Sequence, residues 1–343
     1  MTGARALLSV EDLAVSFRTE LGVVRAVEGA SFELRSGEVL AIVGESGSGK
    51  SVTAMTLMGL TRGPGTEIAG RASLEGVDLI GASEPELRGI RGRRIAMVFQ
   101  DSMTGLDPVQ RVGAQVAEQI TVHEPVSDAA ARARAVELLG RVGIPQPAER
   151  AGAYPHELSG GMRQRVMIAM ALSCEPAVLI ADEPTTALDV TIQAQVIERI
   201  RELREATGAA VILVTHDLGV VAEIADRVAV MYAGRIVEQG TLDELFYDPL
   251  HPYTWGLLGS IARIDGDRPG RLPSIAGAPP SMLDKPPGCH FAPRCPHEFG
   301  RCGEPPSLAR RADGSPDHLD RCWLSTADKR RRRDVGGRIG LGT

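Results

Sequence analysis

The stretch "VLAIVGESGSGKS" (39–51) decides the fold class of this 343-residue chain. Its first five residues are apolar and run into a glycine, which predicts a buried β-strand followed by a tight turn. The next eight residues (44–51) fit the pattern G-x-x-x-x-G-K-[ST] and open a predicted helix over about 50–60, the context that a phosphate-binding loop requires. Glycines let backbone N–H groups close around phosphate oxygens, and the helix N-terminus adds positive potential.

Two side chains of this loop have chemical roles in such a site. Lys50 would reach the β- and γ-phosphates of a nucleotide, and Ser51 would ligate Mg²⁺. The lysine is informative because only three of the 38 basic residues are lysines. We expect nucleotide contacts from the whole loop and the start of its helix, namely Gly44, Glu45, Ser46, Gly47, Ser48, Gly49, Lys50, Ser51 and Val52.

Polar residues end two further apolar runs. "AVLIADEP" (177–184) runs into Asp182, which can hold Mg²⁺ through water, and Glu183, which can polarise the water that attacks the γ-phosphate. "VTHD" (214–217) ends the next strand with His216, which we assign to the γ-phosphate or the attacking water. Open α/β sheets bind ligands at the carboxyl ends of their strands, so these residues are expected at one sheet edge.

The remaining pattern predicts an α/β fold with a mostly parallel sheet covered by helices. Ser127 or Asp128 is the expected N-cap of an amphipathic helix. Ala233-Gly234 is the expected turn of a hairpin. The predicted elements are strands within 7–43, mostly helix from about 104 to 172, strands at 177–182 and 209–215, a helix at 191–206, and the hairpin at 227–240.

Composition narrows the classes of function. The chain is 43% hydrophobic with a net charge of −6, which favours a globular protein and gives no reason to expect nucleic acid as the partner. No apolar run approaches the ~20 residues of a membrane span, and the first residues lack the apolar core of a signal peptide. We therefore expect the chain in the cytoplasm, where thiols stay reduced.

Cysteines gather near the end of the chain, in what we call the cysteine segment, "PPGCHFAPRCPHEFGRC" (286–302). It holds Cys289, Cys295 and Cys302, and Cys322 follows. A small Pro-rich unit without its own hydrophobic core needs a cross-link, such as a bound metal, to be stable. The four cysteines could bind Zn²⁺ or an iron–sulfur cluster as thiolates, or they could remain free thiols. Cys174 is expected to pack as a small apolar residue. His290, His297 and His318 lie nearby, and "KRRRR" (329–333) is expected to be a solvated tail.

One further motif narrows the family. "LSGGMRQRV" (158–166) resembles the signature of ATP-binding cassette (ABC) proteins. In that family two cassettes sandwich two ATP molecules, and the signature faces the nucleotide on the partner subunit. The resemblance therefore implies that this chain dimerises with a second cassette. It also implies that the signature residues act on the partner's nucleotide, here Ser159, Gly160, Gly161 and Gln164.

Other elements of the ABC pattern follow in order. The resemblance implies that Phe17 stacks on adenine and that Gln100 senses Mg²⁺ and the attacking water. It also implies that Asp189, in "TALD" (186–189), crosses the dimer interface. The implied catalytic set is Glu183, His216, Gln100 and Lys50, and the implied Mg²⁺ ligands are Ser51, Gln100 and Asp182.

The resemblance also predicts the fold and its domains. We expect an α/β fold with an ABC-type P-loop NTPase core, an inserted α-helical subdomain and a small Cys-containing C-terminal extension. The nucleotide-binding domain would span 1–250, with its helical subdomain at about 104–172, and the extension would span 251–343.

The end of the chain points to a subgroup. "HPYTWGLL" (251–258) and the stretch 272–296 resemble the C-terminal extension of dipeptide and oligopeptide (and nickel) importer ATPases. This implies an energy-coupling ATPase on the cytoplasmic face of the cell membrane, working with a sister ATPase, two permeases and an extracytoplasmic substrate-binding protein. Similar cysteines in some of those ATPases hold a [4Fe–4S] cluster, which implies the same for Cys289, Cys295, Cys302 and Cys322.

Some features leave alternatives open. The solute could be a dipeptide, a longer peptide, a nickel chelate or another small molecule. The stretch "DSMTGLDPVQRVGAQ" (101–115), expected to face the permease, departs from the subgroup at Ser102, Gly105 and Asp107. A soluble cassette acting on DNA or ribosomes is disfavoured because the chain has one cassette and no long coiled coil. A subunit that binds ATP without turnover is disfavoured because the catalytic residues are all present.

Overall fold

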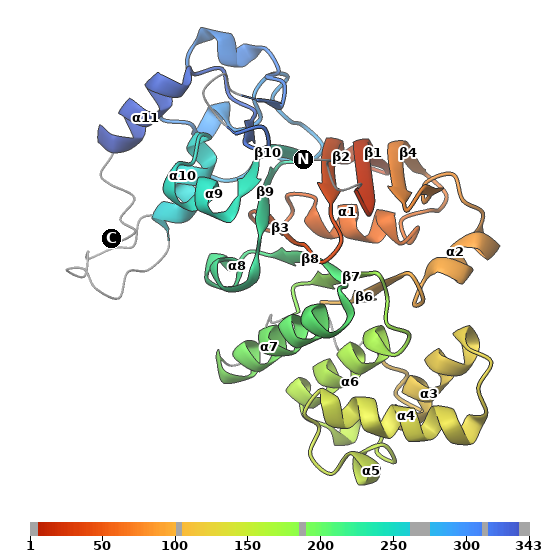
Figure 1. The fold of residues 1–343 in the computed structure, drawn as a ribbon. Helices are drawn as coiled ribbons and strands as arrows, with labels where there is room; N and C mark the ends of the chain where they lie inside the picture. Colours follow the sequence, from red (N-terminus) through yellow and green to blue (C-terminus); the bar gives the residue numbers. More distant parts are fainter. Residues whose placement is uncertain (1–5, 101–104, 185–189, 261–274, 311–314, 336–343) are drawn as a thin grey trace. The chain divides into compact units, whose positions relative to one another are not determined.

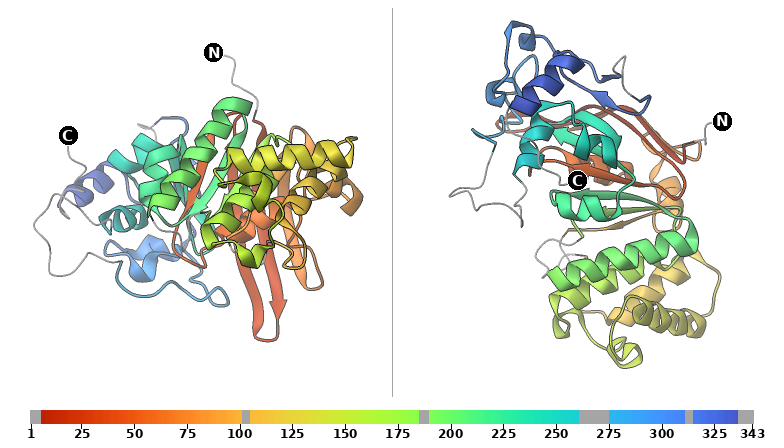
Figure 2. Two further views of the ribbon diagram at one scale, coloured as in Figure 1. Left: turned by 90° about the horizontal axis from the view of Figure 1, so that it is seen from below. Right: turned by 60° about the vertical axis from the view of Figure 1, so that its left-hand side comes forward.

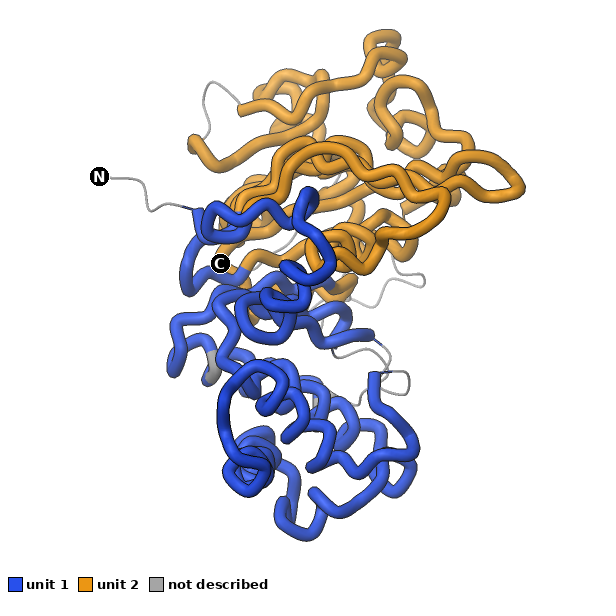
Figure 3. The backbone as a smooth tube through the Cα atoms, turned by 90° about the vertical axis from the view of Figure 1, so that its right-hand side faces the viewer, with its two compact units in different colours: residues 1–8, 34–39, 74–214 blue, residues 9–33, 40–73, 215–343 orange. Residues whose placement is uncertain are grey.

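The computed structural model describes residues 6–100, 105–184, 190–260, 275–310 and 315–335. The chain forms two compact units, which Figure 3 colours separately. Unit 1 comprises 1–8, 34–39 and 74–214, and unit 2 comprises 9–33, 40–73 and 215–343. Both units are built from segments that lie far apart in the sequence, so each core depends on long-range packing.

Unit 2 contains two groups of strands. Strands β1 (Leu8–Thr19) and β2 (Gly22–Leu34) are separated by two residues and form a long hairpin (Figure 2), with β4 (Thr66–Leu74) on the other side of β1. In the second group, β3 (Val39–Val43) pairs in parallel with β9 (Arg227–Tyr232). The order continues from β9 through β10 (Arg235–Thr241) and β12 (Leu319–Asp320) to β11 (Ala309–Arg310).

The β9–β10 hairpin confirms a sequence prediction. Its strands are antiparallel, and the turn residues Ala233 and Gly234 have φ values of 45° and 85°. Two positive φ angles are what a two-residue hairpin turn of matching twist requires. The helices and 3-10 turns of unit 2 are α1 (Lys50–Leu57), α8 (Leu218–Ile224), α9 (Leu242–Tyr247), α10 (Pro252–Gly259), η2 (Ala292–Arg294), η3 (Gly300–Gly303) and α11 (Thr326–Val335).

Helix α11 corrects a prediction, because the run 329–333 is not a solvated tail. The Lys329 side chain is 0% exposed and its ammonium pairs with the Asp320 carboxylate, which is also 0% exposed. Arg330 and Arg333 on the same helix both contact Asp248. The run folds because α11 packs against α10 and offers three of its cations to carboxylates of the unit.

Unit 1 has a parallel strand group. Strands β6 (Ile95–Val98), β7 (Val178–Asp182) and β8 (Ala210–Thr215) are paired in parallel with β7 in the middle. All residues of the three strands are buried, as expected for apolar runs without alternation. The short strand β5 (Val77–Asp78) lies before them in the chain.

The helices of unit 1 confirm the predicted helical stretch. Ser127 is the N-cap of α4, and its hydroxyl accepts a hydrogen bond from Ala130 N–H. Helices α3, α4 and α6 pack on one another (Figure 1). The elements are α2 (Glu84–Ile90), α3 (Val112–His123), α4 (Asp128–Arg141), α5 (Pro147–Arg150), η1 (Pro155–Glu157), α6 (Gly160–Leu172) and α7 (Val190–Thr207). Within the described ranges, none of the helices is long and apolar enough to cross a membrane.

Candidate functional site

The phosphate loop joins β3 to α1 in unit 2. Its glycines adopt positive φ angles, 154° at Gly44, 76° at Gly47 and 106° at Gly49. Space is as restrictive as conformation, because a Cβ on Gly44 would lie 2.1 Å from the carbonyl oxygen of Met231, and one on Gly49 would lie 2.4 Å from that of Ala26. The loop therefore needs glycine at both positions.

Lys50 is buried at the start of α1, and its ammonium donates to the carbonyls of Gly44 at 2.8 Å and Glu45 at 3.0 Å. Ser48 is also buried, and its hydroxyl has no hydrogen-bond partner among the described residues. A buried polar atom without a protein partner calls for an explanation such as a bound ligand. Glycine-rich backbone, a buried ammonium and this hydroxyl together fit a phosphate group.

Residues distant in sequence brace the loop. Gly234 N–H, from the β9–β10 turn, donates to the Ser48 carbonyl at 2.8 Å. Glu45 N–H donates to the Tyr253 hydroxyl at 2.9 Å, and the Glu45 carboxylate pairs with Arg294 at 2.6 Å. Sequence reasoning missed these two partners, because they lie 208 and 249 positions away and no local pattern connects them to the loop.

In unit 1 the structure brings Gln100 and Glu183 together. The carboxamide Nε2 of Gln100 donates to Oε2 of Glu183 at 3.0 Å. Glu183 follows Asp182, which is buried at the end of β7. The backbone of Glu183 has a φ of 46°, and its N–H donates to the Val214 carbonyl at 2.8 Å. Such left-handed backbone in a non-glycine residue is strained, and strain of this kind clusters at functional sites.

Other predicted site residues lie on well-defined elements. His216 follows β8 in an exposed position, and the next residue, Asp217, caps α8 by accepting from Gly219 N–H at 2.8 Å. Phe17 is half-buried on β1, while Ser51 and Val52 are half-buried in the first turn of α1. Ser46 and Gly47 are exposed at the tip of the phosphate loop.

The signature motif begins helix α6. Ser159 is its N-cap, and the hydroxyl accepts from Met162 N–H at 3.3 Å. Ser159 and Gly160 are exposed, Gly161 is half-buried, and Gln164 is buried. The Nε2 of Gln164 has no hydrogen-bond partner in the described part of the chain. Asp189, the predicted residue of the dimer interface, lies outside the described residues.

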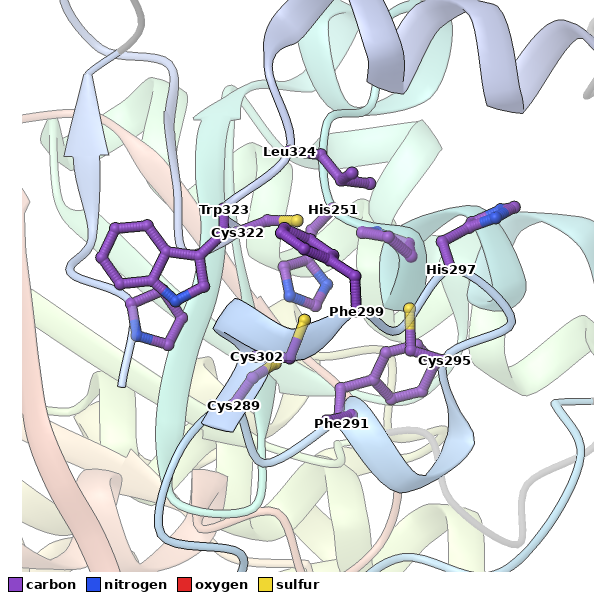
Figure 4. A pocket seen from close by; sticks show the side chains of 13 residues that line it. His251, Cys289, Phe291, Cys295, His297, Phe299, Cys302, Cys322, Trp323 and Leu324 are labelled. Carbon is purple, nitrogen blue, oxygen red and sulfur yellow. The ribbon is translucent and has the colours of Figure 1, made fainter. Parts of the chain in front are cut away.

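The cysteine segment folds into a pocket in unit 2 (Figure 4). The pocket is lined by the four cysteines Cys289, Cys295, Cys302 and Cys322. Other lining residues are Phe291, Phe299, Trp323, His251 and His297. Figure 4 shows the sulfurs of Cys295, Cys302 and Cys322 directed into this space.

Two backbone features bring the cysteines together. Cys289 N–H donates to the Cys302 carbonyl at 2.9 Å. The preceding residue must be small, because a Cβ on Gly288 would lie 2.2 Å from that same carbonyl oxygen. Cys174, the fifth cysteine, lies in unit 1, half-buried with its thiol 3.7 Å from the Gln119 carbonyl oxygen.

The thiols sit in a desolvated environment. Burial raises the pKa of Cys289, raises that of Cys295 to about 12 and raises that of Cys322 to about 11. Burial therefore disfavours the thiolate form of these three residues, and binding of a metal would release their protons. No group of three or more His, Cys, Asp or Glu side chains in the described ranges is arranged to hold one metal ion.

Two family models match the chain. The model described as "ABC transporter" covers residues 27–186. The model described as "Oligopeptide/dipeptide transporter, C-terminal region" covers residues 237–302. The first match contains the phosphate loop and the signature helix, and the second contains the cysteine segment.

Curated relatives match over nearly the whole chain. The dipeptide transport ATP-binding protein DppD of Bacillus subtilis is 52% identical over 93% of this chain and 94% of that protein. The oligopeptide transport ATP-binding protein OppD of the same organism is 52% identical over 94% of this chain and 90% of that protein. DppD of Escherichia coli is 50% identical over 90% of this chain and 94% of its own length.

Solved structures share the fold. A dimeric ATP-binding cassette in a post-hydrolysis state, bound to ADP and phosphate, aligns with a TM-score of 0.62 and 27% identity, over 68% of this chain and 98% of the cassette. The cbiO1 protein of Clostridium perfringens aligns with a TM-score of 0.59 and 30% identity, over 71% of this chain and 91% of its own. The matched fold is the ABC ATPase cassette with mixed α/β sheets.

Proposed function

Because the chain belongs to the ABC transporter family, among the ATP-binding proteins of dipeptide and oligopeptide transport, we propose that it is the ATP-hydrolysing, energy-coupling subunit of a membrane importer for peptides. The observation that carries the ATPase part is the hydrogen bond between Gln100 and Glu183 at the end of a buried parallel strand. The C-terminal family match carries the peptide part.

The residues would divide the chemistry as follows. The phosphate loop and Lys50 bind the triphosphate, and Phe17 stacks on the adenine. Glu183 polarises the attacking water, Gln100 orients the Glu183 carboxylate, and His216 contacts the γ-phosphate or the attacking water. Ser51, Gln100 and Asp182 would hold Mg²⁺, which supplies charge neutralisation on the phosphates.

The proposed partners follow from the transport role. ATP binding would close this cassette on a second one, placing Ser159, Gly160, Gly161 and Gln164 against the partner's nucleotide and Asp189 at the interface. Closure would move two permease subunits that receive the solute from an extracytoplasmic binding protein. The chain would then lie peripherally on the cytoplasmic face of the cell membrane. Its domains would be a nucleotide-binding part over 1–250, including a helical subdomain at about 104–172, and an extension over 251–343.

Transport by the assembled importer tests this role. The chain is co-expressed with its permeases and sister ATPase, reconstituted in vesicles with the binding protein, and supplied with ATP inside. We expect uptake of labelled dipeptide or oligopeptide that stops in a Glu183→Gln variant. Nickel uptake without peptide uptake would support the alternative solute. ATPase activity that is the same with and without the permease subunits would support a soluble cassette.

We propose further that Cys289, Cys295, Cys302 and Cys322 hold a [4Fe–4S] cluster. Four thiols lining one pocket match the ligand set of such a cluster. Each cysteine of a [4Fe–4S] cluster binds a different iron, so its ligands stand farther apart than those of one ion. Zinc is the alternative, and it would require all four sulfurs to lie about 2.3 Å from a single ion.

Metal analysis separates these cases. The chain is purified anaerobically, and iron, sulfide and zinc per polypeptide are measured together with the visible spectrum. A cluster predicts about four irons and broad absorbance that Cys295→Ser removes, while Cys174→Ser, in unit 1, leaves both unchanged. One zinc without iron would assign the pocket to a structural ion. If neither iron nor zinc is found, the cluster proposal is wrong, and the ATPase proposal is unaffected.

A further inference from the structure

Arg294 stands out because it joins the cysteine segment to the phosphate loop inside unit 2. It ends the short turn η2 and directly precedes Cys295. Its side chain is only 5% exposed. The guanidinium donates to both oxygens of one carboxylate, with Nη1 at 2.6 Å from Oε2 and Nη2 at 3.0 Å from Oε1 of Glu45. Two-pronged pairs of this kind fix geometry as well as charge.

The guanidinium is held from several other directions. Its Nε donates to the Ala276 carbonyl at 2.9 Å, and Nη2 also donates to the Ile275 carbonyl at 3.3 Å. Nη1 lies 3.2 Å from the Tyr232 hydroxyl oxygen, and the guanidinium lies 5.7 Å from the centre of that ring. Arg294 therefore presents its charge to Glu45 in one fixed orientation.

Glu45 is the second residue of the phosphate loop, and its backbone is held as firmly as its side chain. Its N–H donates to the Tyr253 hydroxyl, and its carbonyl accepts from the Lys50 ammonium at 3.0 Å and from Ser48 N–H at 3.2 Å. A carboxylate is a poor neighbour for a triphosphate, because like charges at close range repel each other. The loop therefore carries an acidic side chain that needs a partner before the nucleotide binds.

We propose that Arg294 is a positioning residue for ATP binding, which neutralises Glu45 and holds its carboxylate away from the incoming phosphates. The inference rests on the proposed ATP-binding role of the loop. It assigns to the C-terminal part of the chain a direct role at the nucleotide site, reached through a single ion pair. Its signature is that the effect of removing Arg294 depends on the charge at position 45.

A double-mutant cycle on the full-length chain tests this signature. The dissociation constant of a fluorescent ATP analogue with Mg²⁺ is measured for the unaltered chain, Arg294→Ala, Glu45→Ala and the double variant. We expect Arg294→Ala to weaken binding about tenfold when Glu45 is present, and to have little effect when position 45 is alanine, because the unpaired carboxylate is then absent. Added KCl should reduce the loss in Arg294→Ala, since salt screens the repulsion.

Two further variants act as controls. Arg294→Lys keeps the charge and should retain most of the affinity. Arg301→Ala removes an arginine from the same segment, one whose guanidinium lies 3.8 Å above the Trp323 ring, and should bind the nucleotide like the unaltered chain. Iron content and thermal unfolding are recorded for each variant. If Arg294→Ala unfolds, Arg294→Gln takes its place in the cycle, because it also removes the charge while keeping a polar side chain.

The outcomes are distinct. Unchanged affinity in Arg294→Ala would overturn the proposal. A loss that persists in the double variant would also overturn it, since Arg294 would then support the fold rather than the charge balance of the loop. Absence of nucleotide binding by the unaltered chain would instead contradict the proposed ATPase function, and the inference would fall with it.

Discussion

The carboxamide of Gln100 donates a hydrogen bond to the carboxylate of Glu183 across 3.0 Å, although the two residues lie 83 positions apart in the sequence. The contact joins the second residue after β6 to the residue directly after β7, and these two strands are paired in parallel within unit 1. It orients the carboxylate proposed to act on water, while the strained backbone of Glu183 holds that carboxylate at the end of its strand. The pair is thus the hydrolytic element that we propose for this chain.

We predict that Glu183→Gln abolishes turnover but spares ATP binding. The amide has nearly the shape of the carboxylate but cannot accept a proton, so ATPase activity should fall about 10²–10⁴-fold, the usual contribution of a general base. Steady-state phosphate release measures the loss of turnover, and the dissociation constant for ATP measures whether binding is retained. A variant that hydrolyses ATP at the original rate would remove Glu183 from the catalytic role.

Gly49→Ala should destroy the phosphate loop. The new Cβ would lie 2.4 Å from the Ala26 carbonyl oxygen, and the φ of 106° is strained for any L side chain. We expect loss of ATP binding and a lower melting temperature. Gly63→Ala is the matched control, because nothing lies within 4 Å of its added Cβ, and its stability should change by less than about 0.5 kcal/mol. Equal behaviour of the two variants would contradict the steric argument.

Removing one partner of the Lys329–Asp320 pair should lower the free energy of unfolding by several kcal/mol. Both side chains are 0% exposed, so Lys329→Ala leaves a buried carboxylate without its ammonium and should cost about 3–5 kcal/mol in the free energy of unfolding. Denaturant unfolding followed by circular dichroism measures this. Replacing both residues, as Lys329→Met with Asp320→Leu, should recover most of the stability.

A surface pair on the same helix provides the comparison. Arg331 pairs with Asp328, but its side chain is 72% exposed, so Arg331→Ala should cost less than about 1 kcal/mol. If Arg331→Ala and Lys329→Ala were equally destabilising, the burial of the Lys329 pair would have no energetic meaning.

Stability should also fall with rising pH because of His318. This buried imidazole lies 2.9 Å from the Glu238 carboxylate. Burial alone would lower its pKa, but the hydrogen bond and charge of Glu238, with Glu244 and Asp320 nearby, raise it above the usual value. Because the folded pKa exceeds the unfolded one, the protonated form stabilises the fold fully below about pH 6.5, and this contribution is lost as pH rises through the folded pKa.

The His318→Gln variant isolates this contribution. The difference in unfolding free energy between the unaltered chain and the variant should be largest at acidic pH and shrink by about 1.4 kcal/mol for each unit by which the pKa is raised. Denaturant unfolding at a series of pH values from 6 to 9 measures it. A difference independent of pH would mean that His318 stays neutral in the fold.

The chemistry-bearing motifs were predictable because each is local. The geometry of the phosphate loop depends on glycines and a lysine within eight residues, and the apolar run before Asp182 marks a buried strand whatever its neighbours are. The Ala233-Gly234 turn was equally readable, since two positive φ angles favour that kind of dipeptide. Family resemblance then supplied Gln100 and the signature helix, which short-range physics alone does not connect to the loop.

What the sequence by itself determined is therefore the fold class and the phosphate loop, which follow from local spacing, and the family, which follows from the resemblance of its motifs. The tertiary structure decided which groups meet: Arg294 with Glu45, Tyr253 with the loop backbone, and Lys329 with Asp320. It also showed that the charged run 329–333, expected to be a solvated tail, lies in helix α11 with Lys329 buried. The first two contacts join residues 249 and 208 positions apart, and the third joins a strand to the helix that follows it, nine positions on. The free energy of all three comes from burial and pairing in the folded chain, and no local sequence pattern identifies the partner.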